Sequence, residues 1–222
     1  MRLGRLALLL ATLLAVATPA SAQRDRRGGS PGNFDFYVLA LSWTPGFCAL
    51  GGDERRDARE QCADGTGLGF VVHGLWPQYE RGFPSDCSAF ERSPSRIAMR
   101  EADGLFPSEG LARYQWRKHG TCSGSSPAAY FADVRKARDK IAIPPLLTSV
   151  ERDRTLDPMA IERAFTEANP GLRPDMMAVA CRRGTLQEVR ICLTRDLRGF
   201  RSCPEVDRAG CRTRDLRVDS IR

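Results

Sequence analysis

The chain has 222 residues, a formal net charge of +7 and 42% hydrophobic residues. This length fits one domain with its own hydrophobic core, or two small ones, and the absence of internal repeats excludes a repeat array. After the N-terminus no segment reaches the roughly 18 apolar residues of a membrane helix, so we expect no membrane association. The basic charge favours a polyanionic partner only weakly, because many exported proteins are basic for solubility alone.

The first 22 residues have the pattern of a secretory signal peptide. Two arginines precede the apolar stretch 6–17, and the small residues 20–22 form a cleavage site. Its removal takes two arginines and no acidic residue, so the formal charge falls from +7 to +5. Residues 23–33, rich in Arg, Gly, Ser and Pro, predict a flexible lead-in before a domain over 34–222. We therefore expect a secreted or periplasmic protein, with a monomer as the default.

Strands are predicted near both ends of this domain. Residues 34–43 are aromatic and β-branched with near alternation, and 69–76 form a second strand candidate. A hairpin is predicted between 176–181 and 186–193, with its turn at Arg183-Gly184.

Helices are predicted between these strands. One runs over 108–119 and ends at Gly120, and two more begin at Ser126-Pro127 and Asp157-Pro158, where a capping side chain precedes proline. The last of them ends at Asn169-Pro170. Strands at the two ends with helices between them indicate an α+β domain around a mainly antiparallel sheet, flanked by helices.

The chain contains only two histidines, His73 and His119, each in an unusual short run. Histidine both takes and gives a proton near neutral pH, so two in rigid settings suggest an acid and a base. A strand histidine bonded to backbone in the core is the usual alternative for His73. Its neighbours argue against that alternative, because Gly74 allows close backbone approach and Trp76 offers a flat surface for a base.

On the predicted helix, Gln115, Lys118 and His119 stand at i, i+3 and i+4 and therefore share one face. Lys118 is one of only three lysines in the chain, which otherwise uses arginine. The alternative is an ordinary solvated helix face. Aromatic packing by Trp116 and a disulfide at Cys122 make it less favoured, because both would fix the segment.

Eight cysteines in an exported chain indicate up to four disulfides. The sequence has no CxxC pair, and its two histidines are far apart, so a zinc site of the usual spacing cannot be assembled. Spacing alone leaves the connectivity open among 105 possibilities for eight cysteines.

Three runs, FDFYVLALSW, FVVHGLWPQY and WRKHGTC, resemble in order and spacing the signature segments of the ribonuclease T2 family, the exported acid ribonucleases. The later run CRRGTLQEVRICL resembles the bacterial branch of that family. The resemblance spans most of the chain after the signal peptide. It implies a disulfide-stabilised domain that cleaves single-stranded RNA.

The resemblance also implies residue roles. His119 resembles the general base that takes the proton of the ribose 2′-hydroxyl, and His73 the general acid that protonates the leaving 5′-oxygen. Lys118 would stabilise the phosphoryl charge, while Trp76 and Phe83 would stack on bases, although Phe83 could equally be a packing residue. The products would be 2′,3′-cyclic and then 3′-phosphates, made without a metal or other cofactor. DNA would not be cleaved because it lacks the nucleophile.

Two positions depart from the family pattern. Gln115 stands where the family usually has a glutamate that assists the catalytic pair, and Tyr114 where it has a histidine that contacts phosphate. Both keep hydrogen-bonding ability but lose charge or a titratable proton. We expect an active enzyme, slower than its glutamate-bearing relatives. The alternatives are an exported RNA-binding relative with impaired catalysis, and an unrelated phosphodiesterase or phosphatase that uses a phosphohistidine or a metal.

The resemblance further implies the disulfide pairs. The four expected bridges are Cys87 with Cys122, Cys48 with Cys62, Cys192 with Cys203, and Cys181 with Cys211. The first would tie the strand of His73 to the helix of His119.

Overall fold

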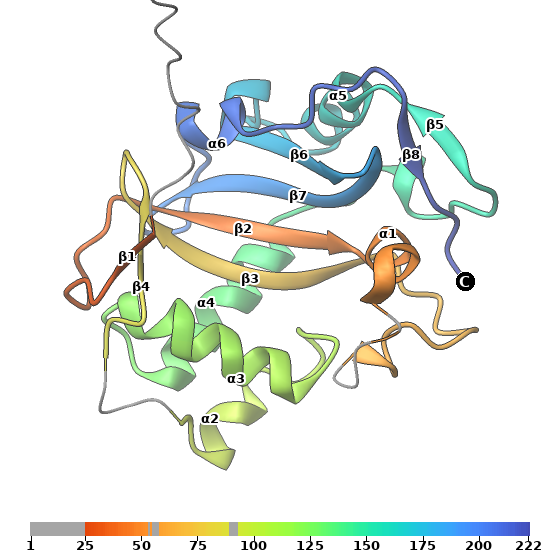
Figure 1. Cartoon of the computed structure of the whole chain (residues 1–222). Coiled ribbons are helices and arrows are strands. Elements are labelled where there is room, and N and C mark those ends of the chain that lie inside the picture. Colours follow the sequence, from red (N-terminus) through yellow and green to blue (C-terminus); the bar gives the residue numbers. More distant parts are fainter. Residues whose placement is uncertain (1–24, 53, 55–57, 89–92) are drawn as a thin grey trace, which may run out of the picture.

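The computed structural model describes residues 25–52, 54, 58–88 and 93–222, so the predicted signal peptide lies outside the described residues. The main sheet is six-stranded and runs in the order β3-β2-β7-β8-β5, with β6 beside β7 (Figure 1). Its strands are β2 (Phe36–Trp43), β3 (Phe70–Gln78), β5 (Arg154–Leu156), β6 (Met177–Arg182), β7 (Thr185–Thr194) and β8 (Leu216–Val218). All pairings in this sheet are antiparallel except β7 with β8. The predicted α+β class with a mainly antiparallel sheet is confirmed.

The predicted strands and hairpin are present with small changes in their bounds. β2 begins two residues later than expected, and β3 continues to Gln78 through Pro77, which an edge strand tolerates. Arg183 and Gly184 both have positive φ, 51° and 73°, at the turn between β6 and β7. A two-residue hairpin turn with this geometry matches the twist of its strands.

The helices lie along and around this sheet. They are α1 (Thr44–Phe47), α2 (Arg96–Arg100), α3 (Glu109–Lys118), α4 (Pro127–Asp139), α5 (Pro158–Ala168) and α6 (Pro204–Arg208), with short helical turns at Cys48–Gly52, Gly120–Cys122, Pro145–Leu147 and Pro174–Met176. α3 and α4 pack near β3, whereas α5 and α6 pack near β6 (Figure 1). Ser126 and Asp157 cap α4 and α5 through their side chains, as predicted, and Ser108 caps α3 in the same way. No helix in the described part of the chain is long and apolar enough to cross a bilayer.

α3 ends where expected, but for a different reason. The helix stops at Lys118 with His119 as its C-cap, and Gly120 does not have a positive φ. A Cβ at Gly120 would lie within 3.0 Å of the Trp116 ring. Glycine is therefore required here by close packing, because Trp116 and Tyr130 fill the space around it.

The two faces of the sheet differ, because successive strand residues point to opposite sides. Tyr37, Leu39 and Leu41 on one face of β2 join the main hydrophobic core. Phe36 and Val38 on the other face belong to a small cluster that Trp76 also contacts. The second face therefore carries the smaller of the two apolar clusters.

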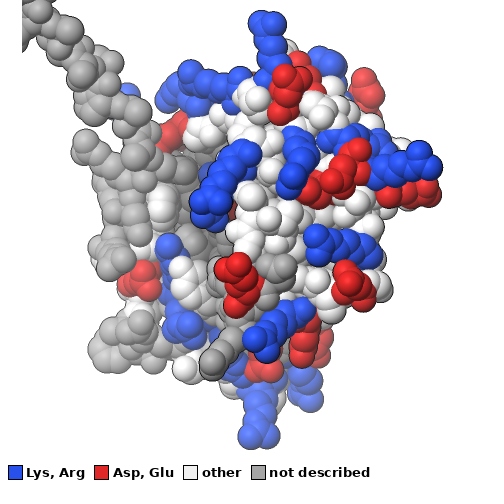
Figure 2. Space-filling view, turned by 45° about the vertical axis from the view of Figure 1, so that its right-hand side comes forward, with Lys and Arg blue, Asp and Glu red and all other residues white. Residues whose placement is uncertain are grey.

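All four disulfides pair as the resemblance implies: Cys48–Cys62, Cys87–Cys122, Cys181–Cys211 and Cys192–Cys203. Three residues of the predicted lead-in form a strand, β1 (Asp25–Arg27), which pairs in parallel with β4 (Phe83–Ser85). This part of the lead-in therefore has regular structure. On the face shown in Figure 2, basic and acidic side chains are intermixed, so the positive charge forms no continuous patch there.

Candidate active site

The structure brings all seven predicted site residues to one cavity of about 260 Å³. They are His73, Trp76, Phe83, Tyr114, Gln115, Lys118 and His119. Their sources are the edge strand β3, the short strand β4 and the last turn of α3. In the described part of the chain, no group of three or more His, Cys, Asp or Glu side chains is arranged to hold a metal ion.

A β-bulge in β3 aims His73 at this cavity. Ala40 of β2 pairs with Gly74 and Leu41 pairs with Val72, so His73 is the extra residue between them. Without the bulge, strict alternation would point His73 to the opposite face of the sheet from Gly74, into the main core. The bulge moves its side chain to the second face of the sheet, where Trp76 lies.

His73 is bonded to a carboxylate from another strand. Its Nδ1 contacts Oε1 of Glu188 on β7, and the second oxygen of Glu188 accepts a hydrogen bond from Arg190 Nε at 2.9 Å. Burial raises the pKa of Glu188, but the hydrogen bond and charge of His73, together with Arg190, outweigh burial and lower that pKa to about 2. An ionised carboxylate only accepts hydrogen bonds, so Nδ1 of His73 carries the proton of this contact.

His119 lies in the opposite environment. The residue is 6% exposed, and among the described residues its buried Nδ1 has no hydrogen-bond partner. Burial, together with the smaller effects of the charges of Lys118 and His73, lowers the pKa of His119 to about 3. His119 is therefore a neutral imidazole throughout the range in which most proteins function.

Trp76 lies between the two histidines. Its ring centroid is 5.3 Å from each imidazole, edge-on to His73 and stacked on His119 at an interplanar angle of 30°. Its indole N–H donates to Oε1 of Gln115 at 2.9 Å. A Cβ on Gly74 would lie within 3.0 Å of both partners of that bond, so Gly74 is needed where the strand meets α3.

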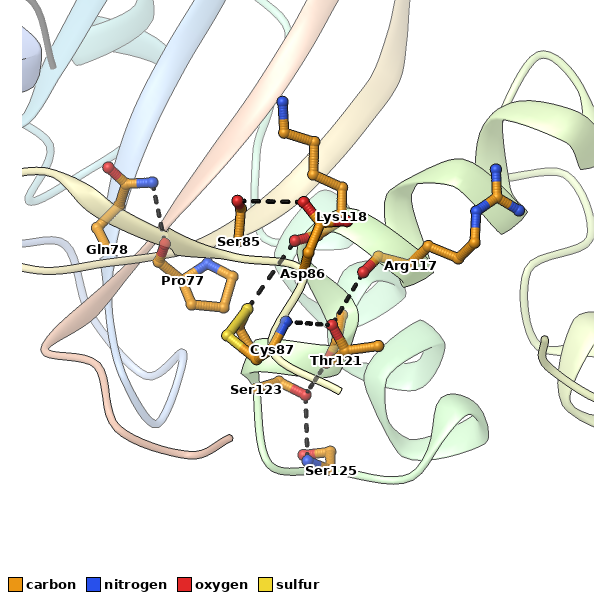
Figure 3. Close-up of a disulfide and its surroundings, with 12 residues drawn as sticks. Pro77, Gln78, Ser85, Asp86, Cys87, Arg117, Lys118, Thr121, Ser123 and Ser125 are labelled. Carbon is orange, nitrogen blue, oxygen red and sulfur yellow. Dashed lines mark hydrogen bonds between the residues drawn. A yellow bond between two sulfur atoms is a disulfide. The ribbon is translucent and has the colours of Figure 1, made fainter. Parts of the chain in front are cut away.

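The disulfide between Cys87 and Cys122 holds the segment after β4 against the end of α3 (Figure 3). The Asp86 N–H donates to the Lys118 carbonyl at 2.8 Å, and the Cys87 N–H donates to Thr121 Oγ1 at 3.2 Å. The Lys118 side chain points away from the disulfide (Figure 3). Phe83 of β4 is thereby held with its ring 6.2 Å from that of His119.

A second cavity of about 560 Å³ adjoins the first, and His73 and Tyr114 line both. Tyr114 is 44% exposed. Gln115, in contrast, is 1% exposed, and its amide oxygen is used by Trp76. The two positions that depart from the family pattern thus have different environments.

Sequence reasoning missed Gln78 and Arg190, which line the first cavity, and Glu188, which lines the second. A signal for two of them was present. Glu188 and Arg190 alternate with apolar residues in the run TLQEVRICL, so both point to the same face of this strand. The neighbouring residues at the centre of the strand are apolar. What the alternation could not show is which strand lies beside them.

A mainly antiparallel sheet with helices near its edge strand, four disulfides and two histidines facing one cavity define a disulfide-stabilised α+β domain with a two-histidine site. A sequence profile described as "Ribonuclease T2 family" matches residues 34–203, so the chain belongs to the ribonuclease T2 family. It is 36% identical over 194 residues to a protein named "Ribonuclease" from Aeromonas hydrophila, covering 86% of this chain and 85% of that one. It is also 28% identical over 222 residues to "Ribonuclease DdI" from Dictyostelium discoideum, covering 93% and 94% of the two chains.

Solved structures share the fold. Trichomaglin, described as a novel S-like ribonuclease, superposes with a TM-score of 0.66 at 22% identity, covering 85% of this chain and 98% of that chain. An "RNase-related protein" from Calystegia sepium gives a TM-score of 0.64 at 20% identity over 85% of this chain and 97% of that one.

Proposed function

We propose that this protein is an endoribonuclease that cleaves single-stranded RNA with His119 as general base and His73 as general acid. The observation that carries this proposal is the contrast between two imidazoles in one cavity. His119 is buried and neutral, whereas His73 is bonded to the ionised Glu188. Environments that favour opposite protonation states are what an acid and base pair requires. Membership of the ribonuclease T2 family and the names of its relatives support the same activity.

In the proposed reaction, neutral His119 removes the proton of a ribose 2′-hydroxyl, whose oxygen attacks the adjacent phosphorus. The bond from phosphorus to the 5′-oxygen breaks, and protonated His73 gives its proton to that oxygen. The ammonium group of Lys118 stabilises the negative charge that gathers on the phosphoryl oxygens. A 2′,3′-cyclic phosphate results, and its hydrolysis with the two roles exchanged yields a 3′-phosphate.

Base binding is proposed for the aromatic side chains of the cavity. Trp76 and Phe83 are half-buried, so part of each ring is open to a ligand. Stacking on such rings contributes roughly 1–3 kcal/mol per base and tolerates different sequences. Tyr114, which also lines the cavity, has a hydroxyl group that can donate a hydrogen bond to phosphate.

The test is incubation of the purified protein with RNA and with DNA in excess chelator, followed by analysis of the new RNA ends. We expect 2′,3′-cyclic phosphate ends on RNA, intact DNA and no effect of the chelator, because substrate and protein supply every reacting group. Export, a monomeric state and freedom from cofactors remain part of the proposal. Loss of cleavage in chelator would instead support a metal-dependent enzyme.

The position of Gln115 favours one rival function. Its amide oxygen holds Trp76, and no carboxylate occupies this place beside His119 and Lys118. A relative that binds RNA without cleaving it would keep the stacking residues and lose the chemistry. RNA that is bound but uncut at every pH would decide for this rival.

A further inference from the structure

The first observation concerns the pairing of Glu188. Oε1 contacts Nδ1 of His73 and Oε2 accepts from Arg190 Nε, so each carboxylate oxygen has its own partner. Glu188 is 8% exposed and lies on a central strand of the sheet. A buried pair of this kind seldom adds stability over apolar residues of the same size. Packing alone therefore does not account for a glutamate at this place.

The second observation is how the contact forms. β3 and β7 are both neighbours of β2, so their backbones lie about 10 Å apart. The bulge turns His73 to the same face as Glu188, and the intervening residues of β2, Ala40 and Ser42, have small side chains. An imidazole and a glutamate can therefore meet above β2. Larger side chains at Ala40 or Ser42 would separate His73 from Glu188.

The third observation concerns charge. The cations Lys118 and Arg190 line the first cavity with His73, and Arg117 lines the second. Glu188 is the only carboxylate in the described lining of the two cavities, since Gln115 holds the position at which the family usually has glutamate. The surrounding cations all oppose a proton on His73. Glu188 is the one neighbour that favours it.

We propose that Glu188 is a positioning residue for His73. The carboxylate of Glu188 fixes the His73 ring with Nδ1 protonated, and it stabilises the proton that Nε2 of His73 delivers to the leaving oxygen. The inference rests on the proposed function in so far as His73 is the acid. Arg190 holds Glu188 by its second oxygen, and its guanidinium lies over the Trp76 ring at 5.4 Å. Through Glu188 and Arg190, strand β7 therefore contacts both His73 and the ring of Trp76.

The first test is independent of activity. Because the chain has only two histidines, imidazole signals of ¹⁵N-histidine-labelled protein assign readily in an NMR titration. In Glu188→Gln the titration midpoint of His73 should move to lower pH than in the wild type, since a neighbouring opposite charge is lost. The midpoint of His119 should change far less. An unchanged midpoint of His73 in the folded variant would overturn the proposal.

The matched control is Asp219→Asn. Asp219 is as buried as Glu188, also 8% exposed, and is likewise paired with an arginine two residues away, Arg217, at 2.9 Å. It lines neither cavity. Both histidine midpoints should stay as in the wild type. If Glu188→Gln does not fold, Glu188→Asp is the second variant, because its shorter side chain keeps the charge but moves it away from His73. A titration midpoint of His73 identical to the wild type would again overturn the proposal.

The second test asks whether Glu188 acts through the acid. On RNA, Glu188→Gln should lose about 10- to 100-fold in kcat/KM, which is part of the roughly 10²–10⁴-fold that a positioned acid supplies. The alkaline limb of the pH profile of kcat/KM should also move to lower pH. On a nucleoside 3′-(4-nitrophenyl phosphate), whose leaving group departs without a proton, the loss should be small. Equal losses on both substrates would contradict the proposal. A wild type inactive on RNA would refute the proposed function, while the NMR result would still report on the Glu188 contact.

Discussion

At the scale of single residues, Gln115 has a structural task that its place beside Lys118 and His119 does not reveal. Its amide oxygen accepts the indole N–H of Trp76, and the side chain is 1% exposed. Any substitution therefore acts on Trp76 as well as on the proposed catalytic groups. A carboxylate can still accept that bond, whereas an apolar side chain cannot.

We predict that Gln115→Glu cleaves RNA at least as fast as the wild type, because it keeps the bond to Trp76 and adds the carboxylate usual in the family. Gln115→Leu should lose roughly tenfold or more in kcat/KM, since an unpaired buried donor costs about 1–3 kcal/mol. Steady-state cleavage of a dinucleotide measures both. A sharp loss in Gln115→Glu with normal activity in Gln115→Leu would contradict this interpretation.

The buried state of His119 predicts the acid limb of the pH profile. With its pKa lowered to about 3, His119, the proposed base, stays neutral far below the ordinary range of histidine. The kcat/KM for RNA should therefore begin to fall from loss of the base only as the pH approaches 3. A limb with its midpoint near 6.5 would show that His119 is not the base in this environment.

At the scale of elements, the end of α3 and the bulged strand β3 must approach closely. Gly74 permits this contact because it lacks the Cβ that would meet Gln115 and Trp76. The bulge next to it sends His73 to the cavity. The spacing between these two elements thus sets the positions of both histidines.

Gly74→Ala should therefore reduce kcat/KM by roughly a hundredfold, because displacement of a catalytic group by about 1 Å has such an effect. Overpacking should also cost about 1–3 kcal/mol in the free energy of unfolding. The matched control is Gly110→Ala in α3, whose Cβ would meet only Ser108 Oγ at 3.9 Å. Activity assays and chemical denaturation of both variants test this, and equal activities would refute it.

At the scale of the whole molecule, four disulfides tie together segments that the sheet alone does not hold. Cys87–Cys122 spans 35 residues beside the cavity, and Cys181–Cys211 spans 30 residues at β6. The two loops are similar in length. Removal of either disulfide should therefore have a similar effect on stability, whereas the effects on activity should differ.

The double variant Cys87→Ser/Cys122→Ser should lose about 4 kcal/mol in the free energy of unfolding, and Cys181→Ser/Cys211→Ser about as much. Only the first should lose roughly 10- to 100-fold in kcat/KM at a temperature where both are folded, because it releases Phe83 and the end of α3. Equal activities would show that the bridge beside the cavity serves stability alone.

Stability in acid follows from the same buried histidine. Below about pH 6.5 the unfolded chain binds a proton at His119 that the folded protein excludes until about pH 3, so stability falls as pH falls through this window. Between pH 7 and pH 5 this group should cost about 2 kcal/mol. Urea denaturation of the wild type and His119→Asn at both pH values measures it. The decline should be smaller in the variant, and parallel declines would contradict the assignment.

Local sequence determined much of this protein. The capping residues, the alternating strands, the turn at Arg183-Gly184 and the pair of histidines in two short runs were all readable, because propensity, capping and periodicity act over a few residues. The resemblance carried by the motifs added the four disulfides and the family.

Only the tertiary structure decided which side chains meet. His73 and Glu188 are 115 positions apart, and their contact depends on the order of three strands and on a bulge of one residue. The burial that lowers the pKa of His119 likewise comes from packing of distant elements. Strand order and register are set by the global burial of apolar surface, which no short run of residues contains.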